Sequence, residues 1–196
     1  MGSIPTAPTK LIIEKILMHT DKDFSGYIKE YIELHTPYAD GKAWKIEEIL
    51  RQFDSAQTYL SLDIRAGWLD HVYQMHEALI AIVPNYSIIQ IKEKFGALRY
   101  YINATECEHD STKQFIVDSI INFGENMSKQ ICERCGKKYY TVSSRSFYHW
   151  THTYCDTCEL EYVNKIISNK QKPSPKELDY QKSIIDKIAS KEKNNK

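Results

Sequence analysis

The pattern of apolar and polar positions predicts a chain of helices that is interrupted by a pair of strands in the middle and by a second hairpin within residues 137–154, which are rich in strand formers. Apolar residues recur at helical spacing over most of the chain, and the spacing changes to strand-like alternation in the middle. The predicted helices cover residues 10–19, 24–35, 43–59, 68–83, 112–130, 159–170 and 176–196. The predicted strands cover residues 87–92 and 98–103.

The two strands lie in the stretch IIQIKEKFGALRYYI. Alternation places Ile89 and Ile91 on one face of the first strand, and Leu98 and Tyr100 on one face of the second. A connection of about five residues around Gly96 fits a hairpin, because glycine allows the positive φ that such loops need. The sequence therefore predicts an antiparallel hairpin in the centre of the chain.

The helices in the second half carry expectations about which faces they bury. The large apolar residues of the helix over residues 112–130 fall on one predicted buried stripe. That stripe consists of Phe115, Ile116, Ile120, Phe123 and Met127. The region from residue 161 onward is rich in lysine, which predicts a solvated helical end that frays.

Five cysteines are present, and four of them form two Cys-x-x-Cys pairs, Cys132 with Cys135 and Cys155 with Cys158. The 19 residues between the pairs give the spacing of a zinc ribbon or treble-clef-like module. Four thiolates complete a tetrahedron and leave no position for water, so the sequence predicts a structural Zn²⁺. His149 or His152 could replace a cysteine, which would open a catalytic alternative.

These elements predict an α+β protein with helices around a small antiparallel hairpin and a zinc-binding module close behind. The expected regions are a helical region over residues 1–60, an α+β core over 61–131, the cysteine module over 132–160 and a lysine-rich helical tail over 161–196. A chain of 196 residues is long enough to bury a core of this kind.

The formal net charge is zero, since the chain contains 26 basic and 26 acidic residues. This charge does not support the class of proteins that coat duplex nucleic acid, which are usually strongly basic. No apolar run approaches the roughly 20 residues of a membrane span. The start of the chain, MGSIPTAPTK, lacks the apolar segment of a secretory signal. We therefore expect a cytoplasmic protein without a membrane partner.

The hairpin carries an unusual set of side chains for a strand pair. Lys92, Lys94 and Arg99 can share one surface, with Phe95 or Tyr101 as a stacking platform. Cations beside an aromatic ring suit a nucleotide, a nucleic-acid backbone or an acidic protein surface. The alternative is an ordinary solvated strand face whose charges prevent edge-to-edge association.

Three segments also resemble a family of uncharacterised bacteriophage and prophage proteins. They are GWLDHVYQMHEAL, IIQIKEKFGALRYYI, and the cysteine module with ICERCG and YHWTHTYCDTC. The chain departs at Ala97, where the family tends to have a second glycine. The matching positions are Trp68, Lys92, Glu93, Lys94, Phe95, Gly96, Leu98, Arg99 and Tyr100. The resemblance implies this architecture and a bacterial or phage-infected host cell, but no settled mechanism.

The leading functional hypothesis is a small zinc-stabilised binding protein. Its hairpin residues Lys92, Lys94, Phe95, Arg99 and Tyr101 would engage a nucleotide, a nucleic acid or a host protein. In a phage setting this hypothesis includes countering host defence. One alternative is a nuclease or nucleotide hydrolase that uses Glu93, Lys94 or His109, although the common enzyme motifs are missing. The other is a structural or assembly protein. The sequence decides neither the partner nor the oligomeric state.

Overall fold

The computed structural model describes residues 23–54, 60–138, 141–147 and 150–194. The predicted helix over residues 10–19 lies outside these residues. The elements are α2 (Ser25–His35), α3 (Ala43–Arg51), β1 (Leu62–Asp63), a 3₁₀ turn (Ala66–Trp68), α4 (Leu69–Ile82), β2 (Ser87–Lys94), β3 (Ala97–Asn103), a second 3₁₀ turn (Thr105–Cys107), α5 (Ser111–Ser128), β4 (Val142–Phe147), β5 (Trp150–Cys155), α6 (Asp156–Ser168) and α7 (Pro175–Asn194). The expected α+β class is confirmed.

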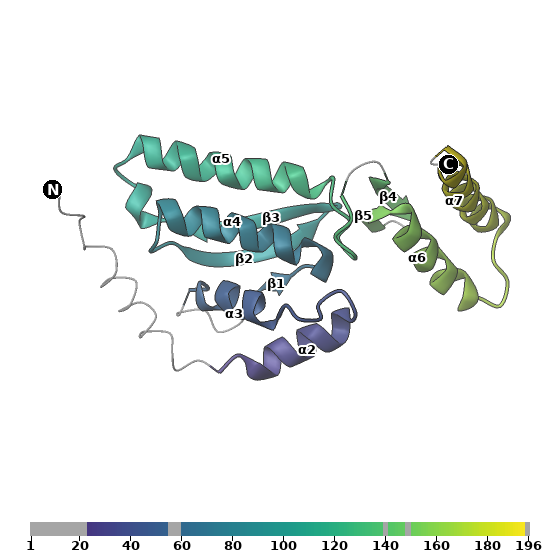
Figure 1. The fold of residues 1–196 in the computed structure, drawn as a ribbon, viewed down its shortest axis with the longest axis horizontal. Helices are drawn as coiled ribbons and strands as arrows, with labels where there is room; N and C mark the ends of the chain where they lie inside the picture. Colours follow the sequence, from purple (N-terminus) through teal and green to yellow (C-terminus); the bar gives the residue numbers. More distant parts are fainter. Residues whose placement is uncertain (1–22, 55–59, 139–140, 148–149, 195–196) are drawn as a thin grey trace.

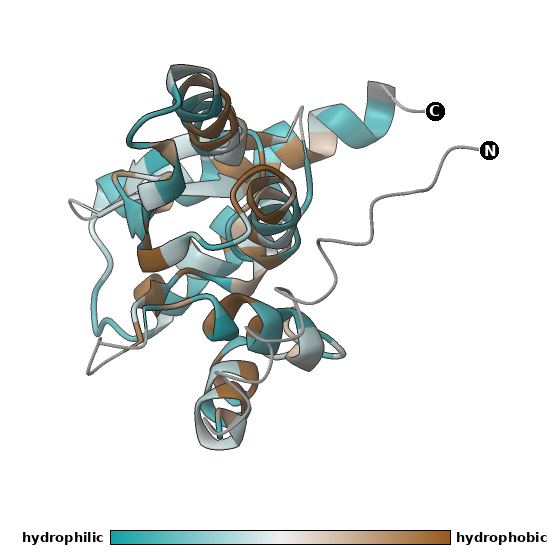
Figure 2. Ribbon diagram, turned by 90° about the vertical axis from the view of Figure 1, so that its left-hand side faces the viewer, coloured by the Kyte–Doolittle hydropathy of each residue, from teal (hydrophilic) through white to brown (hydrophobic). Residues whose placement is uncertain are grey.

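A three-stranded sheet in the order β1-β2-β3 forms the centre of the first half of the chain. Strands β2 and β3 are antiparallel, as expected, whereas β1 runs parallel to β2 and was not foreseen. Figure 1 shows α4 and α5 beside this sheet, α2 and α3 beyond β1, and the β4–β5 hairpin with α6 and α7 at the far end. In Figure 2 the apolar positions gather toward the middle of the molecule.

The predicted inward face of β2 is wrong in its first half. Ile88 and Ile91 are fully buried, and Ile89 is exposed. The pairing with β3 shifts register between Ile88 and Gln90, which marks a β-bulge. A bulge adds one residue to one strand and so reverses the alternation beyond it.

The turn between β2 and β3 is also shorter than expected. Lys94 pairs with Ala97, so the loop contains only Phe95 and Gly96. Both have positive φ, 54° and 72°. Positive φ at both central residues is the requirement of a type I′ turn, the two-residue loop that matches strand twist. Glycine adopts this conformation easily, but phenylalanine does so at a cost in backbone strain.

Side chains close both edges of the three-stranded sheet. On the β1 side, the hydroxyls of Tyr27 and Tyr31 in α2 donate to the carbonyls of Leu62 and Ile64, at 3.3 and 3.0 Å. On the β3 side, two α5 residues accept from strand amides. Ser128 Oγ accepts from Leu98 N at 3.0 Å, and Glu125 Oε1 accepts from Tyr100 N at 3.0 Å. Buried edge groups thus keep hydrogen-bond partners, and further strand pairing at these positions is prevented.

The predicted buried stripe of α5 is wrong for its two phenylalanines. Phe115 and Phe123 are largely exposed, and the buried positions are Val117, Gly124 and Ser128. A Cβ at Gly124 would overlap the Met75 side chain of α4. Small residues therefore let α5 approach α4 closely, and this close packing decides the orientation of the helix in place of the larger apolar side chains.

The C-terminal helices are attached to the cysteine module. The Phe147 and Tyr180 rings stack with centroids 5.1 Å apart, and Ile184 of α7 is buried beside Val163 of α6. Lys187 Nζ and Lys191 Nζ lie 3.1 and 2.6 Å from the carboxylate of Asp156, which is buried. The expectation of a solvated tail is therefore wrong for this face of α7.

Candidate metal centre and binding surfaces

The sulfur atoms of Cys132, Cys135, Cys155 and Cys158 form one cluster in which all lie within 4.8 Å of one another. Cys135 Sγ and Cys155 Sγ are 3.7 Å apart. A tetrahedron with metal–sulfur bonds of about 2.3 Å has sulfur–sulfur edges of about 3.8 Å. The four cysteines can therefore hold one metal ion, as the spacing predicted.

Local structure explains how the two pairs converge. In the first pair, the Gly136 amide donates to Cys132 O at 2.8 Å, and Gly136 has φ +77°, which gives a tight knuckle. In the second pair, Cys155 is the residue directly before α6, and Cys158 lies in the first turn of that helix. A helix N-terminus favours thiolates, since its unpaired amides carry partial positive charge.

The four thiols hydrogen-bond with one another. These contacts lower the pKa of Cys135 to about 7 and that of Cys155 well below its usual value, and they raise the pKa values of Cys132 and Cys158. His152 does not join the cluster, because its Nε2 lies 2.6 Å from Glu159 Oε2 in a fully buried pair. His149 lies outside the described residues. A metal ion held by these four sulfurs would have a complete tetrahedral coordination sphere, which is the arrangement of closed four-cysteine sites.

The Gly-Trp pair before α4 packs directly on the first cysteine knuckle. Gly67 N donates to Glu133 O at 2.9 Å, and Trp68 Nε1 donates to Ile131 O at 2.8 Å. A Cβ at Gly67 would overlap the Cys132 carbonyl oxygen. Only glycine fits here without movement of the backbone.

The tip of the β2–β3 hairpin packs on the other side of the module. Thr153 Oγ1 in β5 donates to Gly96 O at 2.6 Å, and a Cβ at Gly96 would lie 3.2 Å from side-chain oxygens of Ser144 and Thr153. Glu93 Oε1 accepts from Gly96 N at 2.5 Å and so braces the turn. The three segments that carry the family resemblance therefore meet at one junction, and two residues of the KEKFG motif, Glu93 and Gly96, serve this contact.

The structure separates the five hairpin residues into two lysine–aromatic pairs and Arg99, which makes other contacts. By strand alternation Lys92, Lys94, Arg99 and Tyr101 share the face opposite Glu93. Lys92 Nζ lies 5.5 Å from the centre of the Tyr101 ring, and Lys94 Nζ lies 5.7 Å from that of Phe95. These two lysine–aromatic pairs are called the hairpin face below.

Arg99 has a different role from the lysines. Its Nη1 donates to Leu98 O at 2.7 Å and lies 3.4 Å from Glu125 Oε2 of α5. The guanidinium thus helps to hold α5 along β3. Phe95 and Tyr101, by contrast, are 75% and 41% exposed. The folding contacts explain Arg99, and they leave the exposed rings without an explanation.

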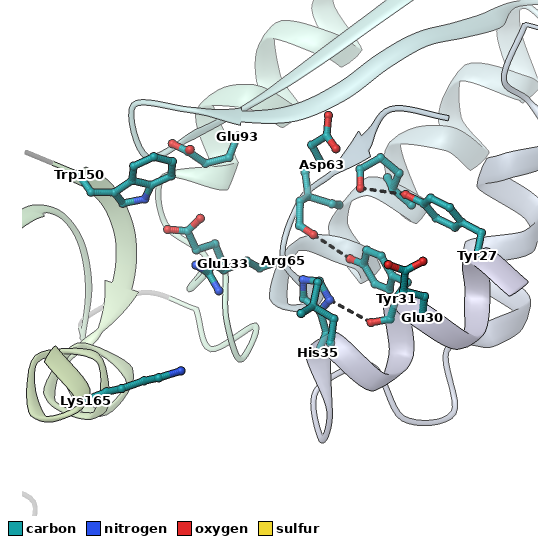
Figure 3. Close-up of a pocket in the computed structure, with 13 residues that line it drawn as sticks. Tyr27, Glu30, Tyr31, His35, Asp63, Arg65, Glu93, Glu133, Trp150 and Lys165 are labelled. Atoms are coloured by element: carbon teal, nitrogen blue, oxygen red, sulfur yellow. Dashed lines mark hydrogen bonds between the residues drawn. The ribbon is translucent and has the colours of Figure 1, made fainter. Parts of the chain in front are cut away.

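Sequence reasoning missed a groove of about 730 Å³ between α2 and the cysteine module. Figure 3 shows side chains from both sides converging on it. Its lining consists of Tyr27, Glu30, Tyr31, Leu34, His35, Leu62, Asp63, Ile64, Arg65, Glu93, Glu133, Trp150 and Lys165. These residues come from segments far apart in the chain, so no local motif could have revealed the groove.

Glu133 is the most deeply placed polar side chain of the groove. It is 2% exposed, and its Oε1 accepts from Thr153 N at 2.8 Å. Burial raises the pKa of Glu133 to about 8, against the opposing effects of this hydrogen bond and of the Arg65 guanidinium. A buried carboxyl group in a concave site marks a candidate binding position.

The residues proposed for the enzyme alternative are not brought into a catalytic arrangement. Glu93 and Lys94 point to opposite faces of β2. Glu93 also braces the turn. His109 is exposed in the loop before α5. The remaining Cys107 is buried, and burial raises the pKa of its thiol, which makes it a poor nucleophile.

Comparison of the chain with protein-family models, curated proteins and solved structures gives no match. The resemblance to a bacteriophage and prophage family therefore stays a prediction. No helix within the described ranges is both long enough and apolar enough to cross a membrane.

Proposed function

We propose that the protein is a non-enzymatic binding protein and that its hairpin face binds a phosphate-bearing ligand with a stacking base, either a nucleotide or a single-stranded nucleic acid. The observation that carries the proposal is the pairing of two exposed aromatic rings with two lysines on one strand face, Tyr101 with Lys92 and Phe95 with Lys94. An aromatic platform takes a base, and the neighbouring ammonium takes a phosphate.

The spacing of the hairpin face supports this ligand class. Lys92 and Lys94 are two residues apart on one strand, which corresponds to about 7 Å. Stacking on aromatic rings tolerates any base, since every base has a π-face. The backbone strain at Phe95 supports a role in binding as well, because an exposed phenylalanine with φ 54° costs stability and buries little of its ring in the fold.

We also propose that the metal is zinc and that residues 132–168 form a treble-clef-like module. A knuckle, a hairpin and a helix that carries the second cysteine pair follow one another in this segment. Four thiolates select a soft or borderline ion, and zinc is the usual occupant of a closed four-sulfur site. The ion would act by fixing the module against which the hairpin tip packs.

Fluorescence anisotropy with a labelled oligothymidylate tests the proposal, with unlabelled mononucleotides as competitors. The test variant is Lys92→Ala/Lys94→Ala, and its control is Lys172→Ala/Lys182→Ala, which removes the same charge from exposed lysines elsewhere. We expect the test variant to bind about tenfold or more weakly, with a smaller dependence of affinity on salt. Competition by mononucleotides would assign a nucleotide ligand.

Equal affinity of the test and control variants would overturn the proposal. Binding of neither nucleotide nor oligonucleotide by the zinc-loaded wild type would also overturn it, and would leave a host protein as the partner to seek. The proposal that the protein counters host defence in a phage setting depends on this binding.

A further inference from the structure

We propose that residues 10–19, which lie outside the described residues, form a short helix that docks in the groove between α2 and the cysteine module. The occupant of the groove is thus a segment of this same chain. It pairs with α2 as an antiparallel helical hairpin, and its apolar side covers the apolar side chains of the groove walls.

One wall of the groove is a stripe of α2 at helical spacing. Tyr27, Tyr31 and Leu34 recur at i, i+4 and i+7, and all three line the groove. The two tyrosine hydroxyls donate to carbonyls at β1, which fixes this side of α2 toward the groove. Leu34, at the end of the stripe, is 77% exposed. The apolar stripe of α2 is therefore only partly covered within the described residues.

The opposite wall adds a second exposed apolar side chain. Trp150 of β5 lines the groove and is 55% exposed. Figure 3 shows Tyr27 and Tyr31 on one side of the groove and Trp150 on the other. Burial of apolar surface stabilises a contact by roughly 25 cal/mol per Å². Large apolar side chains on two facing walls therefore favour an apolar occupant.

The chain enters α2 at one end of this groove. Phe24 is buried in the main core, and Asp23 Oδ1 accepts from Ser25 N at 2.8 Å, which caps the helix. Tyr27, the first residue of the stripe, follows within one turn. Only residues 20–24 separate the segment from α2, and loops of about two to five residues join antiparallel helices. The segment is therefore placed to turn back along α2.

The segment KLIIEKILMH has the pattern of a helix with one strongly apolar side. Four large residues at i, i+1, i+4 and i+5 share that side, and they are Ile12, Ile13, Ile16 and Leu17. Ten residues of helix are about 15 Å long, and the 11 residues of α2 span about 16 Å. A helix this short is marginal alone in water, so it needs a surface that covers its apolar side.

A segment of the same chain fits the groove better than a separate protein does. Two exposed apolar side chains, Leu34 and Trp150, are a small surface for a separate partner, because stable interfaces bury about 800 Å² on each side. A tethered segment docks without the loss of translational freedom that a separate partner pays. A small apolar groove beside the point where the chain enters α2 is therefore sufficient for it.

Amide hydrogen exchange of the zinc-loaded protein, followed by two-dimensional NMR, tests the docking. The test variant is Ile12→Ser/Ile16→Ser, and its control is Leu11→Ser/Met18→Ser, which changes two apolar residues on the other side of the helix. We expect slow exchange of residues 10–19 in the wild type and the control, and about tenfold or more faster exchange in the test variant. Leucine and methionine favour helices more than isoleucine does, so protection from helix propensity alone would fall more in the control.

The groove side is tested in the same way. The test variant is Leu34→Ser/Trp150→Ser, and its control is Phe115→Ser/Phe123→Ser, which removes two exposed apolar side chains from α5. We expect residues 10–19 to lose protection in the test variant and to keep it in the control. Amides of the buried helix α4 should exchange as in the wild type in all variants, which shows that the fold is retained.

Rapid exchange of residues 10–19 in the wild type would overturn the inference. Equal exchange of these residues in either test variant and its control would overturn it as well. Protection that decreases when the protein is diluted would show that the segment docks on a second copy of the chain, and this result would overturn the pairing within one chain.

Discussion

The Thr153 hydroxyl donates a 2.6 Å hydrogen bond to the Gly96 carbonyl and thereby joins the cysteine module to the tip of the β2–β3 hairpin. The two residues are 57 positions apart in the chain, and the bond is buried. Each partner is held from its own side, Gly96 by the Glu93 carboxylate and Thr153 by that of Glu133. The hairpin tip is therefore a fixed surface, and its exposed side chains are presented in a defined position.

Removing the hydroxyl should loosen this junction. Thr153→Val keeps the shape of the side chain but leaves the Gly96 carbonyl without its donor, so we expect a loss of about 1–3 kcal/mol in the free energy of unfolding. Thr153→Ser retains the hydroxyl and should lose less. Urea denaturation measures both variants. A Thr153→Val protein as stable as the wild type would show that the bond does not hold the hairpin tip.

Gly67 gives a sharper test of the contact between the Gly-Trp pair and the cysteine knuckle. Gly67→Ala places a Cβ against the Cys132 carbonyl oxygen and 2.6 Å from Gly136 N, both backbone atoms. We expect a loss of about 3 kcal/mol or more, together with weaker retention of the metal. Competition with a chromophoric chelator measures that retention.

Gly26→Ala is the matched control for this variant. Gly26 is an exposed helical residue of α2, and a Cβ there meets nothing within 4 Å. Alanine should therefore stabilise α2 by about 0.5–1 kcal/mol. If Gly67→Ala behaved like Gly26→Ala, the close approach of the two backbones would be refuted.

Phe95 should lower the stability of the fold while it contributes to ligand binding. Asn-Gly is the preferred pair of a type I′ turn, because asparagine tolerates positive φ. Phe95→Asn should thus raise the free energy of unfolding by about 1 kcal/mol while weakening oligonucleotide binding about tenfold through loss of the ring. Thermal denaturation and anisotropy measure the two effects. A variant that binds like the wild type would remove Phe95 from the hairpin face.

The buried His76 should make the free energy of unfolding depend on pH. Burial lowers its pKa from 6.5 to about 4, and its Nδ1 lies 2.7 Å from the Tyr86 hydroxyl. Between these values the unfolded chain takes up a proton that the folded protein does not. Stability therefore falls as the pH decreases from about 6.5 toward 4, by up to about 3 kcal/mol.

The comparison that isolates His76 is the difference in unfolding free energy between wild type and His76→Gln, measured by urea denaturation at each pH. Metal loss in acid and the lowered pKa values of His35 and His71 affect both proteins and cancel. We expect the advantage of the wild type to shrink with acidification. A difference that is constant across the pH range would refute the assignment.

The parts of the fold that sequence reasoning found are those determined by local spacing. The two cysteine pairs form knuckles that depend on a few neighbouring residues, and α4 follows a regular apolar stripe. Ile89 was misplaced because a bulge depends on the partner strand, and Phe115 and Phe123 because Gly124 and Ser128 determine the packing of α5. The groove between α2 and the cysteine module was missed because its wall residues, such as Glu30 and Glu133, meet only in three dimensions.

Metal content is the most direct test of the claim that the four cysteines organise the junction on which the hairpin face depends. Native mass spectrometry of protein purified without added metal should find one zinc ion bound per chain. Chelation should then unfold the module and release the hairpin tip, since metal binding and folding are linked in such sites. A metal-free protein that keeps the same fold, with four cysteines that all react with a thiol reagent, would contradict the account.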